Sequence, residues 1–539
     1  MNQHPKSIQL HALLAEAGIH IPPSLSSALT VSGLASDSRL VRSGDLFVAI
    51  PGLHTDARDY IPVAMAKGAI AVVTEAEGDS SIAADIPIIS VPNARVALAR
   101  LYDAWYNHPA RRLRLVGVTG TNGKTSVSTM LRHILRAAGI PCGLIGTVGC
   151  FTPMGDATIC GGTDGHDALA VSGMTTPEPA TLYALLHRMA EDVAADASDE
   201  AKPVVIMEVT SHALWFGRVA PLTFETSIFT NLTPEHLDLH GTMEAYFAVK
   251  RRLFEVSRRA VVNADDRYGR LLLSEPLPVG HWYICHAADM AGIPPDRMCP
   301  AGDGGCTRVY AEQVKHLGED GVAFKLTTPD VRVRVRCPVP GEFTVMNAMQ
   351  AAAAALSLGV PPSVIRSAIA SFPGVPGRME VIARPDAKFP ATVVIDFAHT
   401  PDALEQVLAT THAARRRGQR IVLLFGCGGD RDRSKRKVMA RIASRMADSV
   451  IITSDNSRSE RPADIISDIL AGMDKESEFA VVPDRAEAIR YAIRNARMGD
   501  IILLCGKGHE TYEITAEGKH PFSEKTIVAE AICEFWKQA

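Results

Sequence analysis

The chain has 539 residues, of which 47% are hydrophobic and 22% are charged, and its formal net charge is -4. At roughly 150 residues per domain, this length predicts three or four domains of ordinary globular composition. The small negative charge excludes the basic field that attracts nucleic acid or an acidic membrane.

No apolar stretch reaches the ~20 residues that span a bilayer, and the first residues lack the pattern of a secretory signal peptide. The ten cysteines include no C-x2-C pair of the kind that binds zinc. We therefore expect reduced and mostly buried thiols, no membrane insertion and a cytoplasmic location.

The predicted elements divide the chain into three segments, at residues 1–108, 109–376 and 377–539. In the first segment we expect two short strands and one helix, at residues 45–50, 69–74 and 61–67. The second segment opens with a buried strand, a glycine-rich loop and an amphipathic helix, and three strands follow. These strands and the helix are predicted at residues 113–118, 125–138, 204–207, 227–229 and 260–262.

The third segment alternates strands with helices. Strands are predicted at residues 392–395, 421–425, 449–453, 479–482 and 501–504, and helices at residues 402–414, 436–446, 463–472 and 485–496. This alternation predicts a parallel, doubly wound sheet. Two other stretches, residues 155–173 and 191–202, are rich in small and acidic residues and are predicted to be surface insertions.

The glycine-rich loop reads Thr-Gly-Thr-Asn-Gly-Lys-Thr at residues 119–125. Because it follows a buried strand and opens a helix, its backbone N–H groups can face a polyphosphate. Lys124 is placed to reach the β- and γ-phosphates, and the Thr125 hydroxyl to hold Mg²⁺. The spacing is a variant, since Val118 stands where the common phosphate loop has glycine. The loop predicts nucleotide binding but not the reaction.

Further motifs lie before and after this loop along the chain. They are Asp37-Ser38-Arg39, Thr175-Thr176-Pro177, Glu208-Val209-Thr210-Ser211-His212, Asn231-Leu232-Thr233-Pro234-Glu235-His236, Asn347, Gly377-Arg378-Met379-Glu380, Asp396-Phe397-Ala398-His399, Gly428-Gly429-Asp430-Arg431 and Gly506-Lys507-Gly508-His509-Glu510. In this order they resemble the Mur ligase family over nearly the whole chain. Within that family the chain is most similar to the ligases that add the third amino acid to a UDP-N-acetylmuramoyl dipeptide.

The resemblance implies three α/β domains: an N-terminal domain that binds the UDP-sugar, a central ATPase with a phosphate loop and a mostly parallel sheet, and a C-terminal Rossmann-like domain that binds the amino acid. It also implies that ATP phosphorylates the D-glutamate side-chain carboxylate and that an amine attacks the acyl phosphate. The ATP-binding residues implied are Gly120, Thr121, Asn122, Gly123, Lys124, Thr125, Ser126, Asn347, Arg378, Asp396 and His399.

A metal site is expected where Glu208 closes an apolar strand, because a buried carboxylate there needs a cation or a partner. With Thr125, Glu208 is expected to hold one Mg²⁺, and His236 to help hold a second. In similar ligases the lysine equivalent to Lys250 is carbamylated and supplies an anionic oxygen ligand, so Lys124, Lys250, His236 and Glu208 are the expected catalytic residues. The alternatives are a salt bridge for Glu208, a capping or core histidine at His236 and a solvated lysine at position 250.

The resemblance also implies which residues bind the UDP-N-acetylmuramoyl-L-alanyl-D-glutamate substrate. They are Ser36, Ser38, His54, Thr55, Thr175, Thr176, Thr210 and Arg218. Arg218 would offer a bidentate grip on a carboxylate.

Asp455-Asn456-Ser457-Arg458 resembles the signature of Mur ligases that add meso-diaminopimelate. Arg458 and Arg431 would bind the distal carboxylate of that acceptor, and a lysine acceptor would leave them without it. Gly506 and Glu510 would bind the end of the acceptor that carries the distal ammonium and carboxylate. Ser457 replaces the proline of the signature, and an alternative pairs Arg458 with Glu460 on a surface loop.

We therefore expect a ligase that adds meso-diaminopimelate, with small-molecule substrates only and a monomeric chain. The same ligase with L-lysine or another acceptor is one alternative. A second, folylpolyglutamate synthase, shares the ATPase core but lacks the motif at Asp37-Ser38-Arg39. A non-catalytic nucleotide-binding relative is a third.

Overall fold

The computed structural model describes residues 7–23, 25–52, 56–75, 86–153, 155, 174–191, 198, 202–287 and 305–536. Both predicted insertions lie almost entirely outside these residues. By its internal contacts the chain forms two compact units. The first comprises Met1–Thr119, Ile140–Ser227 and Ala248–Arg258, and the second comprises Gly120–Gly139, Ile228–Phe247 and Arg259–Ala539. The boundaries of the three sequence segments stay a prediction.

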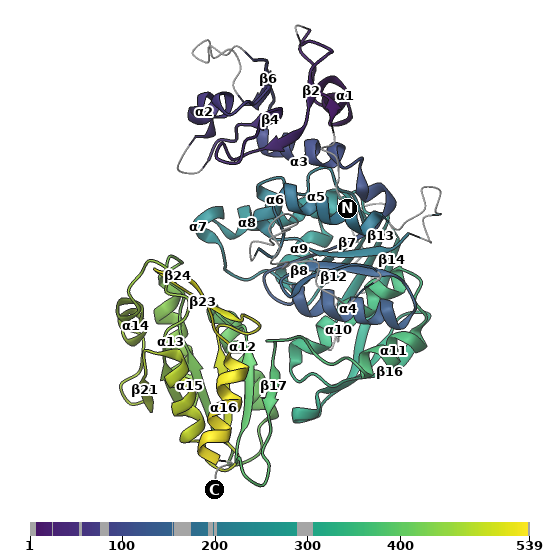
Figure 1. Cartoon of the computed structure of the whole chain (residues 1–539). Coiled ribbons are helices and arrows are strands. Elements are labelled where there is room, and N and C mark those ends of the chain that lie inside the picture. The colour runs from purple at the N-terminus through teal and green to yellow at the C-terminus, as the bar shows by residue number, and fades with distance from the viewer. Residues whose placement is uncertain are drawn as a thin grey trace. The chain divides into compact units, whose positions relative to one another are not determined.

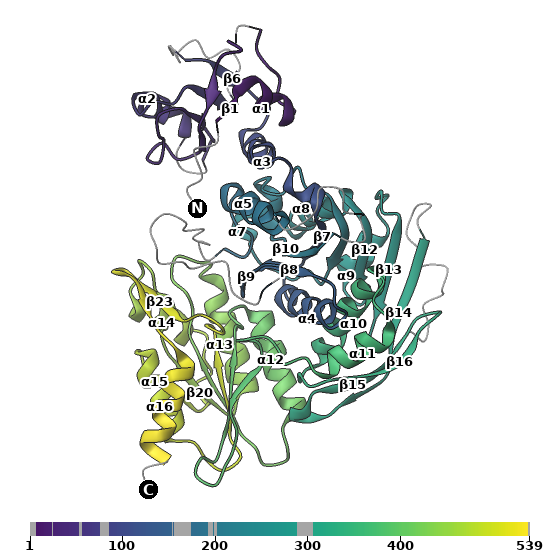
Figure 2. The same cartoon turned by 45° about the vertical axis from the view of Figure 1, so that its right-hand side comes forward.

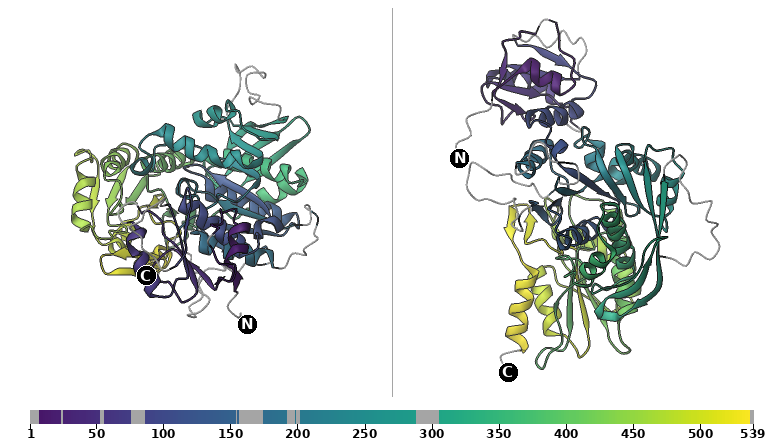
Figure 3. Two further views of the ribbon diagram at one scale, coloured as in Figure 1. Left: turned by 90° about the horizontal axis from the view of Figure 1, so that it is seen from above. Right: turned by 90° about the vertical axis from the view of Figure 1, so that its right-hand side faces the viewer.

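The first unit begins with a small parallel sheet whose strands follow chain order. This sheet lies in the purple part of the chain in Figure 3. Its strands are β3 (Gly33–Ala35), β4 (Asp45–Val48), β5 (Ala71–Thr74) and β6 (Ile88–Ser90), with β1 (Ile8–Gln9) and β2 (Thr30–Val31) as a separate antiparallel pair. Helices α1 (Leu10–Glu16) and α3 (Ala94–Trp105) pack on one face, where Leu13 lies among Leu46 and Val48. Helix α2 (Ile61–Ala66) packs on the other, through Ile61 against Phe47. The predicted strands and helix are confirmed, with shorter ends.

The same unit contains the strand that precedes the phosphate loop, β7 (Arg114–Thr119). Strand β10 (Val204–Glu208) runs parallel to β7 and to β8 (Cys142–Gly146), and β9 (Gly149–Phe151) pairs antiparallel with β8. The register sets Glu208 opposite Val118, so two strands end at the same level. Other elements here are α5 (Pro179–Ala190), α6 (Ser211–Trp215), β11 (Phe224–Phe229) and α8 (Met243–Glu255), of which the last two continue into the second unit.

In the second unit a run of neighbouring strands changes from parallel to antiparallel (Figure 2). The strands are β12 (Ser257–Asn263), β13 (His281–His286), β14 (Gly305–His316), β15 (Val322–Thr327) and β16 (Arg332–Cys337). Helix α4 (Lys124–Ala137) packs against α10 (Glu342–Ser357), and both contact α11 (Pro362–Ala370). Helix α10 is rich in buried alanines, which lets neighbouring backbones approach closely. Only β12 of this strand run was predicted.

The third sequence segment folds into the predicted doubly wound sheet. The strand order is β17-β18-β22-β19-β20-β21, and only β17 is antiparallel to its neighbour. The strands are β17 (Glu380–Ala383), β18 (Thr392–Asp396), β19 (Ile421–Phe425), β20 (Ser449–Ile452), β21 (Phe479–Val481) and β22 (Ile501–Cys505). Because β22 lies between β18 and β19, the strand order reverses there, which is where ligands bind in open α/β sheets.

Helices cover both faces of this sheet, with α15 and α16 side by side on one of them (Figure 1). The helices are α12 (Pro401–Ala414), α13 (Ser434–Met446), α14 (Pro462–Leu470), α15 (Arg485–Arg494) and α16 (Glu524–Trp536). A hairpin of β23 (Tyr512–Thr515) and β24 (Gly518–Pro521) precedes α16. Among the described residues, no helix combines the length and apolar character needed to cross a membrane.

Candidate active site

The phosphate loop has the strand–loop–helix geometry that the sequence predicts. At Gly120 the backbone φ is 146°, and a Cβ atom would lie 1.9 Å from the Thr230 hydroxyl oxygen, so only glycine fits. The Lys124 ammonium donates hydrogen bonds to the Gly120 and Thr121 carbonyl oxygens, at 2.9 and 2.7 Å. The lysine is thereby held over the loop, where a phosphate could accept its hydrogen bonds instead of these carbonyl oxygens.

Asn122 fixes the loop to two other parts of the second unit. Its backbone N–H donates to Asn231 Oδ1 at 2.9 Å, and its carbonyl oxygen accepts from Thr230 Oγ1 at 2.6 Å. Its side-chain amide donates to Asp402 Oδ2 at 2.8 Å, in the first turn of α12. The phosphate loop and helix α12 are therefore in direct contact.

Three predicted nucleotide contacts lie close to this loop or are buried in it. Thr125 is buried, Ser126 is partly exposed, and the Asn347 Oδ1 atom would lie 2.8 Å from a Cβ at Gly123. The Asn347 amide is therefore packed directly against the loop backbone.

Arg378 and Asp396 are two further residues that the sequence predicts to contact the nucleotide, and each is held by its own neighbours. The Arg378 guanidinium stacks 4.6 Å above the Phe397 ring. Asp396 accepts from the backbone N–H groups of Met379 and Ala398, at 2.7 and 2.8 Å, and burial raises the pKa of its carboxyl group. Asp396 thus shapes the turn before β17.

Glu235 connects two predicted site histidines. Its carboxylate oxygens lie 3.7 Å from His236 Nε2 and 3.9 Å from His399 Nε2. His236 occupies the N-cap of α7 (Leu237–His240) but makes no side-chain cap hydrogen bond, and its side chain is 40% exposed, so it is neither a capping nor a core histidine. Sequence reasoning quoted Glu235 within a motif but gave it no role.

Glu208 is fully buried at the end of β10 and is held by a residue that sequence reasoning missed. The Thr147 backbone N–H donates to Glu208 Oε1 at 3.0 Å, and the Thr147 hydroxyl donates to Oε2 at 2.9 Å. The hydroxyl groups of Thr147 and Thr175 are 3.0 Å apart. Because Thr147 directly follows β8, the rule that ligands gather at strand carboxyl ends could have found it.

Lys250 is 1% exposed, so the alternative of a solvated helix lysine is wrong. Its Nζ atom lies 3.5 Å from Thr119 Oγ1, at the end of β7. Among the described residues, no group of three or more histidine, cysteine, aspartate and glutamate side chains has a metal-binding arrangement.

The residues expected to bind the UDP-sugar lie in the first unit. Ser38 is buried and Ser36 is exposed, while His54 and Thr55 lie outside the described residues. Thr176 and Thr210 have their hydroxyl oxygens 3.2 Å apart.

Arg218 is already engaged in this structure. It donates to the Thr176 carbonyl oxygen at 2.9 Å and forms an ion pair with Glu178. Burial lowers the pKa of Arg218, although the charge of Glu178 opposes that shift.

The acceptor residues predicted from the sequence come together at the reversal point of the C-terminal sheet. Arg458 Nη1 donates to the carbonyl oxygens of Gly429 and Asn456, at 2.9 and 3.2 Å. Arg431 donates to the Asp430 carbonyl oxygen at 2.9 Å. Burial, and then the like charge of Arg431, lowers the pKa of Arg458. Two cations this close favour an anion between them.

The alternative that pairs Arg458 with Glu460 is wrong. Glu460 pairs with Arg436, a fully buried arginine of α13, through contacts of 2.8 and 3.0 Å. Glu460 also accepts from the Asp430 backbone N–H at 2.6 Å. This network fixes the loop around Ser457, which is itself buried.

On the other side of the acceptor site lie an amide and a carboxylate. Asn456 Nδ2 donates to Glu510 Oε2 at 2.8 Å. Asp455 is buried beside Gly506, where φ is 118° and a Cβ atom would lie 2.5 Å from Asp455 Oδ2. The site therefore offers guanidinium donors, an amide donor and a carboxylate, which suit a zwitterionic ligand with a further carboxylate.

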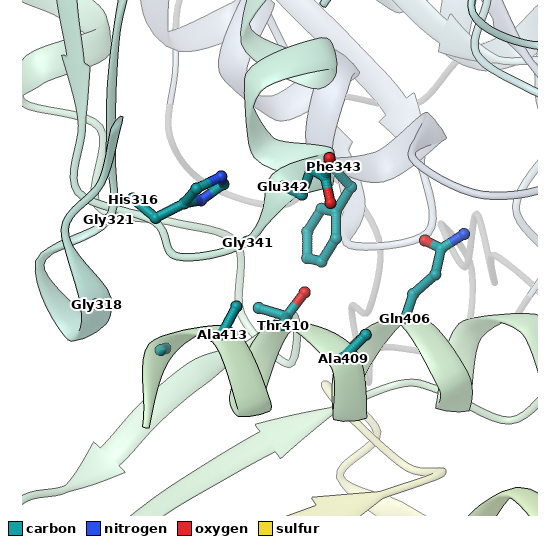
Figure 4. Close-up of a pocket in the computed structure, with 11 residues that line it drawn as sticks. His316, Gly318, Gly321, Gly341, Glu342, Phe343, Gln406, Ala409, Thr410 and Ala413 are labelled. Carbon is teal, nitrogen blue, oxygen red and sulfur yellow. The ribbon is translucent and has the colours of Figure 1, made fainter. Parts of the chain in front are cut away.

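A separate cavity of about 340 Å³ lies between the β14–β15 turn, the start of α10 and helix α12. Figure 4 shows the Phe343 ring above Thr410 of α12, with Gln406 further along the same helix. No residue that lines this cavity belongs to the predicted substrate sites, so its size alone does not locate the chemistry.

The fold and these residues define a nucleotide-binding enzyme of the mostly parallel α/β class. Family profiles described as "Mur ligase family, catalytic domain", "Mur ligase middle domain" and "Mur ligase, glutamate ligase domain" match residues 30–106, 118–355 and 377–508.

Two relatives carry the name UDP-N-acetylmuramoyl-L-alanyl-D-glutamate--2,6-diaminopimelate ligase. The one from Synechococcus elongatus is 39% identical over 537 residues, covering 98% of this chain and 99% of the relative. The one from Pseudomonas aeruginosa is 39% identical over 507 residues, covering 93% and 95%.

Two solved structures are also similar to this chain. A ligase of the same name has a TM-score of 0.63 at 29% identity, covering 98% of this chain and 99% of that one. A related ligase from Thermotoga maritima in complex with ADP, at 15% identity and a TM-score of 0.52, covers 95% and 99% and shares the fold. The chain belongs to the Mur ligase family and is an ATP-dependent ligase.

Proposed function

We propose that this ligase adds meso-diaminopimelate to UDP-N-acetylmuramoyl-L-alanyl-D-glutamate in peptidoglycan synthesis. The names of its relatives support this proposal. The observation that carries the choice of acceptor is the pair of neighbouring guanidiniums, Arg431 and Arg458, beside the Asn456–Glu510 pair. Diaminopimelate has a distal carboxylate for the two arginines, whereas lysine would leave the half-buried Arg458 and the exposed Arg431 without that anion.

In the proposed reaction, a carboxylate oxygen of the D-glutamate side chain attacks the γ-phosphorus of ATP, and ADP leaves. The amine nitrogen of the acceptor then attacks the acyl carbon, inorganic phosphate leaves, and the nitrogen loses a proton. The N–H groups of the phosphate loop and Lys124 would compensate the charge that develops on the transferred phosphoryl group.

We also propose Mg²⁺ as the metal that neutralises the nucleotide phosphates. The fully buried carboxylate of Glu208, fixed through both oxygens by Thr147, fits a hard cation that prefers oxygen ligands. Lys250 is buried at the neighbouring strand end and would supply a second anionic oxygen ligand as a carbamate. The contributions of Thr125 and His236, and a second ion, remain predictions from the resemblance.

The three-domain division, the nucleotide and UDP-sugar contacts, a monomeric state and a cytoplasmic location belong to the same proposal. The cytoplasm supplies ATP, and the eight described cysteines are all free thiols.

Phosphate release by the purified chain tests the proposal. We expect release from ATP only when UDP-N-acetylmuramoyl-L-alanyl-D-glutamate and meso-diaminopimelate are both present. Reactions with L-lysine, L-ornithine or D-glutamate in place of diaminopimelate are the controls. Equal turnover with lysine would overturn the choice of acceptor, and no turnover with any amino acid would favour a non-catalytic relative.

A further inference from the structure

One residue behind the acceptor site, Lys507, lies within the motif at residues 506–510 but was given no role there. It follows strand β22 and is 0% exposed. Its ammonium donates to Asn456 Oδ1 at 2.9 Å and to the Tyr512 carbonyl oxygen at 3.0 Å. It also lies 5.3 Å above the Phe522 ring and 3.8 Å from Glu510 Oε2. A buried ammonium is costly unless it is paired and hydrogen-bonded, so these contacts are needed to hold Lys507 here.

The hairpin β23–β24 contacts Asn456 as well. The Ile514 backbone N–H donates to Asn456 Oδ1 at 2.9 Å, and the Ile514 carbonyl oxygen accepts from the Arg458 backbone N–H at 3.1 Å. The hairpin thus binds the acceptor loop at two successive places. Lys507 bonds both to this loop and to the start of the hairpin.

These contacts decide which way the Asn456 carboxamide points. The two groups that face its oxygen, an ammonium and a backbone N–H, are hydrogen-bond donors, so an amide NH₂ group in that position would be repelled. The NH₂ group must therefore face Glu510, where it donates at 2.8 Å. One N–H of Asn456 then serves Glu510 and the other is left to donate to a ligand carboxylate.

We propose that Lys507 is a positioning residue for the acceptor: it holds the Asn456 carboxamide with its N–H groups toward Glu510 and the bound amino acid. Asn456 then presents a donor to the carboxylate of the acceptor while Glu510 accepts from its ammonium. Lys507 itself touches no substrate. This inference rests on the proposed function, because it needs an amino acid in the acceptor site.

The test is a double-mutant cycle with Lys507→Met and Asn456→Leu, both close in shape to the residues they replace. Lys507→Met should raise the KM for meso-diaminopimelate about 10- to 100-fold, the range for hydrogen bonds to charged groups. The KM for ATP and kcat should change by less than about threefold, because uniform binding is lost rather than chemistry. Calorimetric titration of the full chain with meso-diaminopimelate should show the same loss of affinity.

Adding Lys507→Met to Asn456→Leu should change the acceptor KM by no more than about twofold, since coupled residues are not additive. The matched control is Lys519→Met on the same hairpin, where the lysine is exposed and stacks on Tyr512; its acceptor KM should stay at the wild-type value. Thermal unfolding of each variant reports whether the fold is kept. If Lys507→Met is unstable, Asn456→Leu alone must still raise the acceptor KM.

An unchanged acceptor KM in a folded Lys507→Met protein would overturn the inference and leave the proposed function standing. Fold-changes that multiply in the double variant would overturn it as well, because Lys507 would then act independently of Asn456. A wild-type chain that turns over with no amino acid would overturn the proposed function and this inference together.

Discussion

The phosphate loop and the proposed acceptor site are built by different means. The loop between β7 and α4 is built from backbone, and Gly120 and Gly123 are required because side chains would collide with Thr230 and Asn347. The acceptor site is built from side chains on three separate stretches, which meet at the sheet reversal and are held by buried charges such as Arg436 and Arg485. A backbone site can be recognised from one short motif, whereas a side-chain site depends on residues far along the chain.

The largest expected effect is a loss of folding stability when Arg485, which holds strands around the acceptor site, is replaced. This fully buried arginine binds Glu524 Oε1 at 2.9 Å and the carbonyl oxygens of Ser454 and Cys505, at 3.2 and 2.9 Å. Arg485→Met leaves Glu524 as an uncompensated buried carboxylate, so we expect about 3–5 kcal/mol of destabilisation. The midpoint of urea unfolding measures it.

The matched control is Arg490→Met, on the same helix, where the arginine forms partly exposed pairs with Glu530 and Glu534. Its unfolding midpoint should stay near that of the wild type, because exposed ion pairs contribute little. A similar shift of the unfolding midpoint in both variants would contradict the claim that the buried charge of Arg485 stabilises this part of the fold.

The next largest effect is a loss of kcat when Lys124 of the phosphate loop is replaced. Lys124→Met should lower kcat about 100- to 1000-fold, the typical loss for one group that stabilises transition-state charge, and should leave unfolding and the acceptor KM unchanged. Phosphate release measures it, with Lys437→Met as the exposed control on α13. A fall in stability with kcat maintained would show that Lys124 only braces the loop through its own carbonyls.

A smaller effect distinguishes the acceptor site from the phosphate loop. Arg458→Ala should raise the KM for meso-diaminopimelate about 10- to 100-fold and leave the KM for ATP unchanged, because a charged hydrogen bond to the acceptor is lost. Arg433→Ala, at an exposed arginine paired with Asp468, is the control. If the acceptor KM of Arg458→Ala equals that of the wild type, the two arginines are not the carboxylate site.

The smallest effect concerns Thr147, which supports the Glu208 carboxylate. Thr147→Val removes the hydroxyl that donates to Glu208 and keeps the shape. We expect the Mg²⁺ concentration for half-maximal activity to rise about tenfold, the lower end for a lost support of a metal ligand. Thr30→Val, at an exposed strand position, is the control. An unchanged Mg²⁺ requirement would mean that Glu208 needs no such support.

Much of the fold could be predicted because local patterns and tertiary structure agree. In the third segment the predicted strands and helices match β18 to β22 and α12 to α15 within a few residues, since each strand is an apolar run bounded by polar turns. The strands β13 to β16 were missed. Strand β16, for example, alternates arginine with valine and cysteine, which is the pattern of a half-buried strand, so this signal was available and was overlooked.

Site residues were predicted where they belong to a local sequence motif. They were missed where their role depends on a partner far away along the chain. Arg458 and Glu460 are neighbours in sequence, yet Glu460 binds Arg436, 24 positions away, because that arginine is buried and needs an anion. Thr147 and Lys507 were given no role for the same reason. Each acts on a residue more than 50 positions from it, and no local spacing reveals such a partner.

The hairpin β23–β24 has a consequence for engineering. It lies more than 50 residues after the acceptor loop, yet its Ile514 holds both Asn456 and Arg458. Transplanting residues 455–460 from a relative with another amino-acid preference would therefore carry only part of the recognition surface. A successful graft would have to bring the hairpin and the lysine at position 507 with the loop.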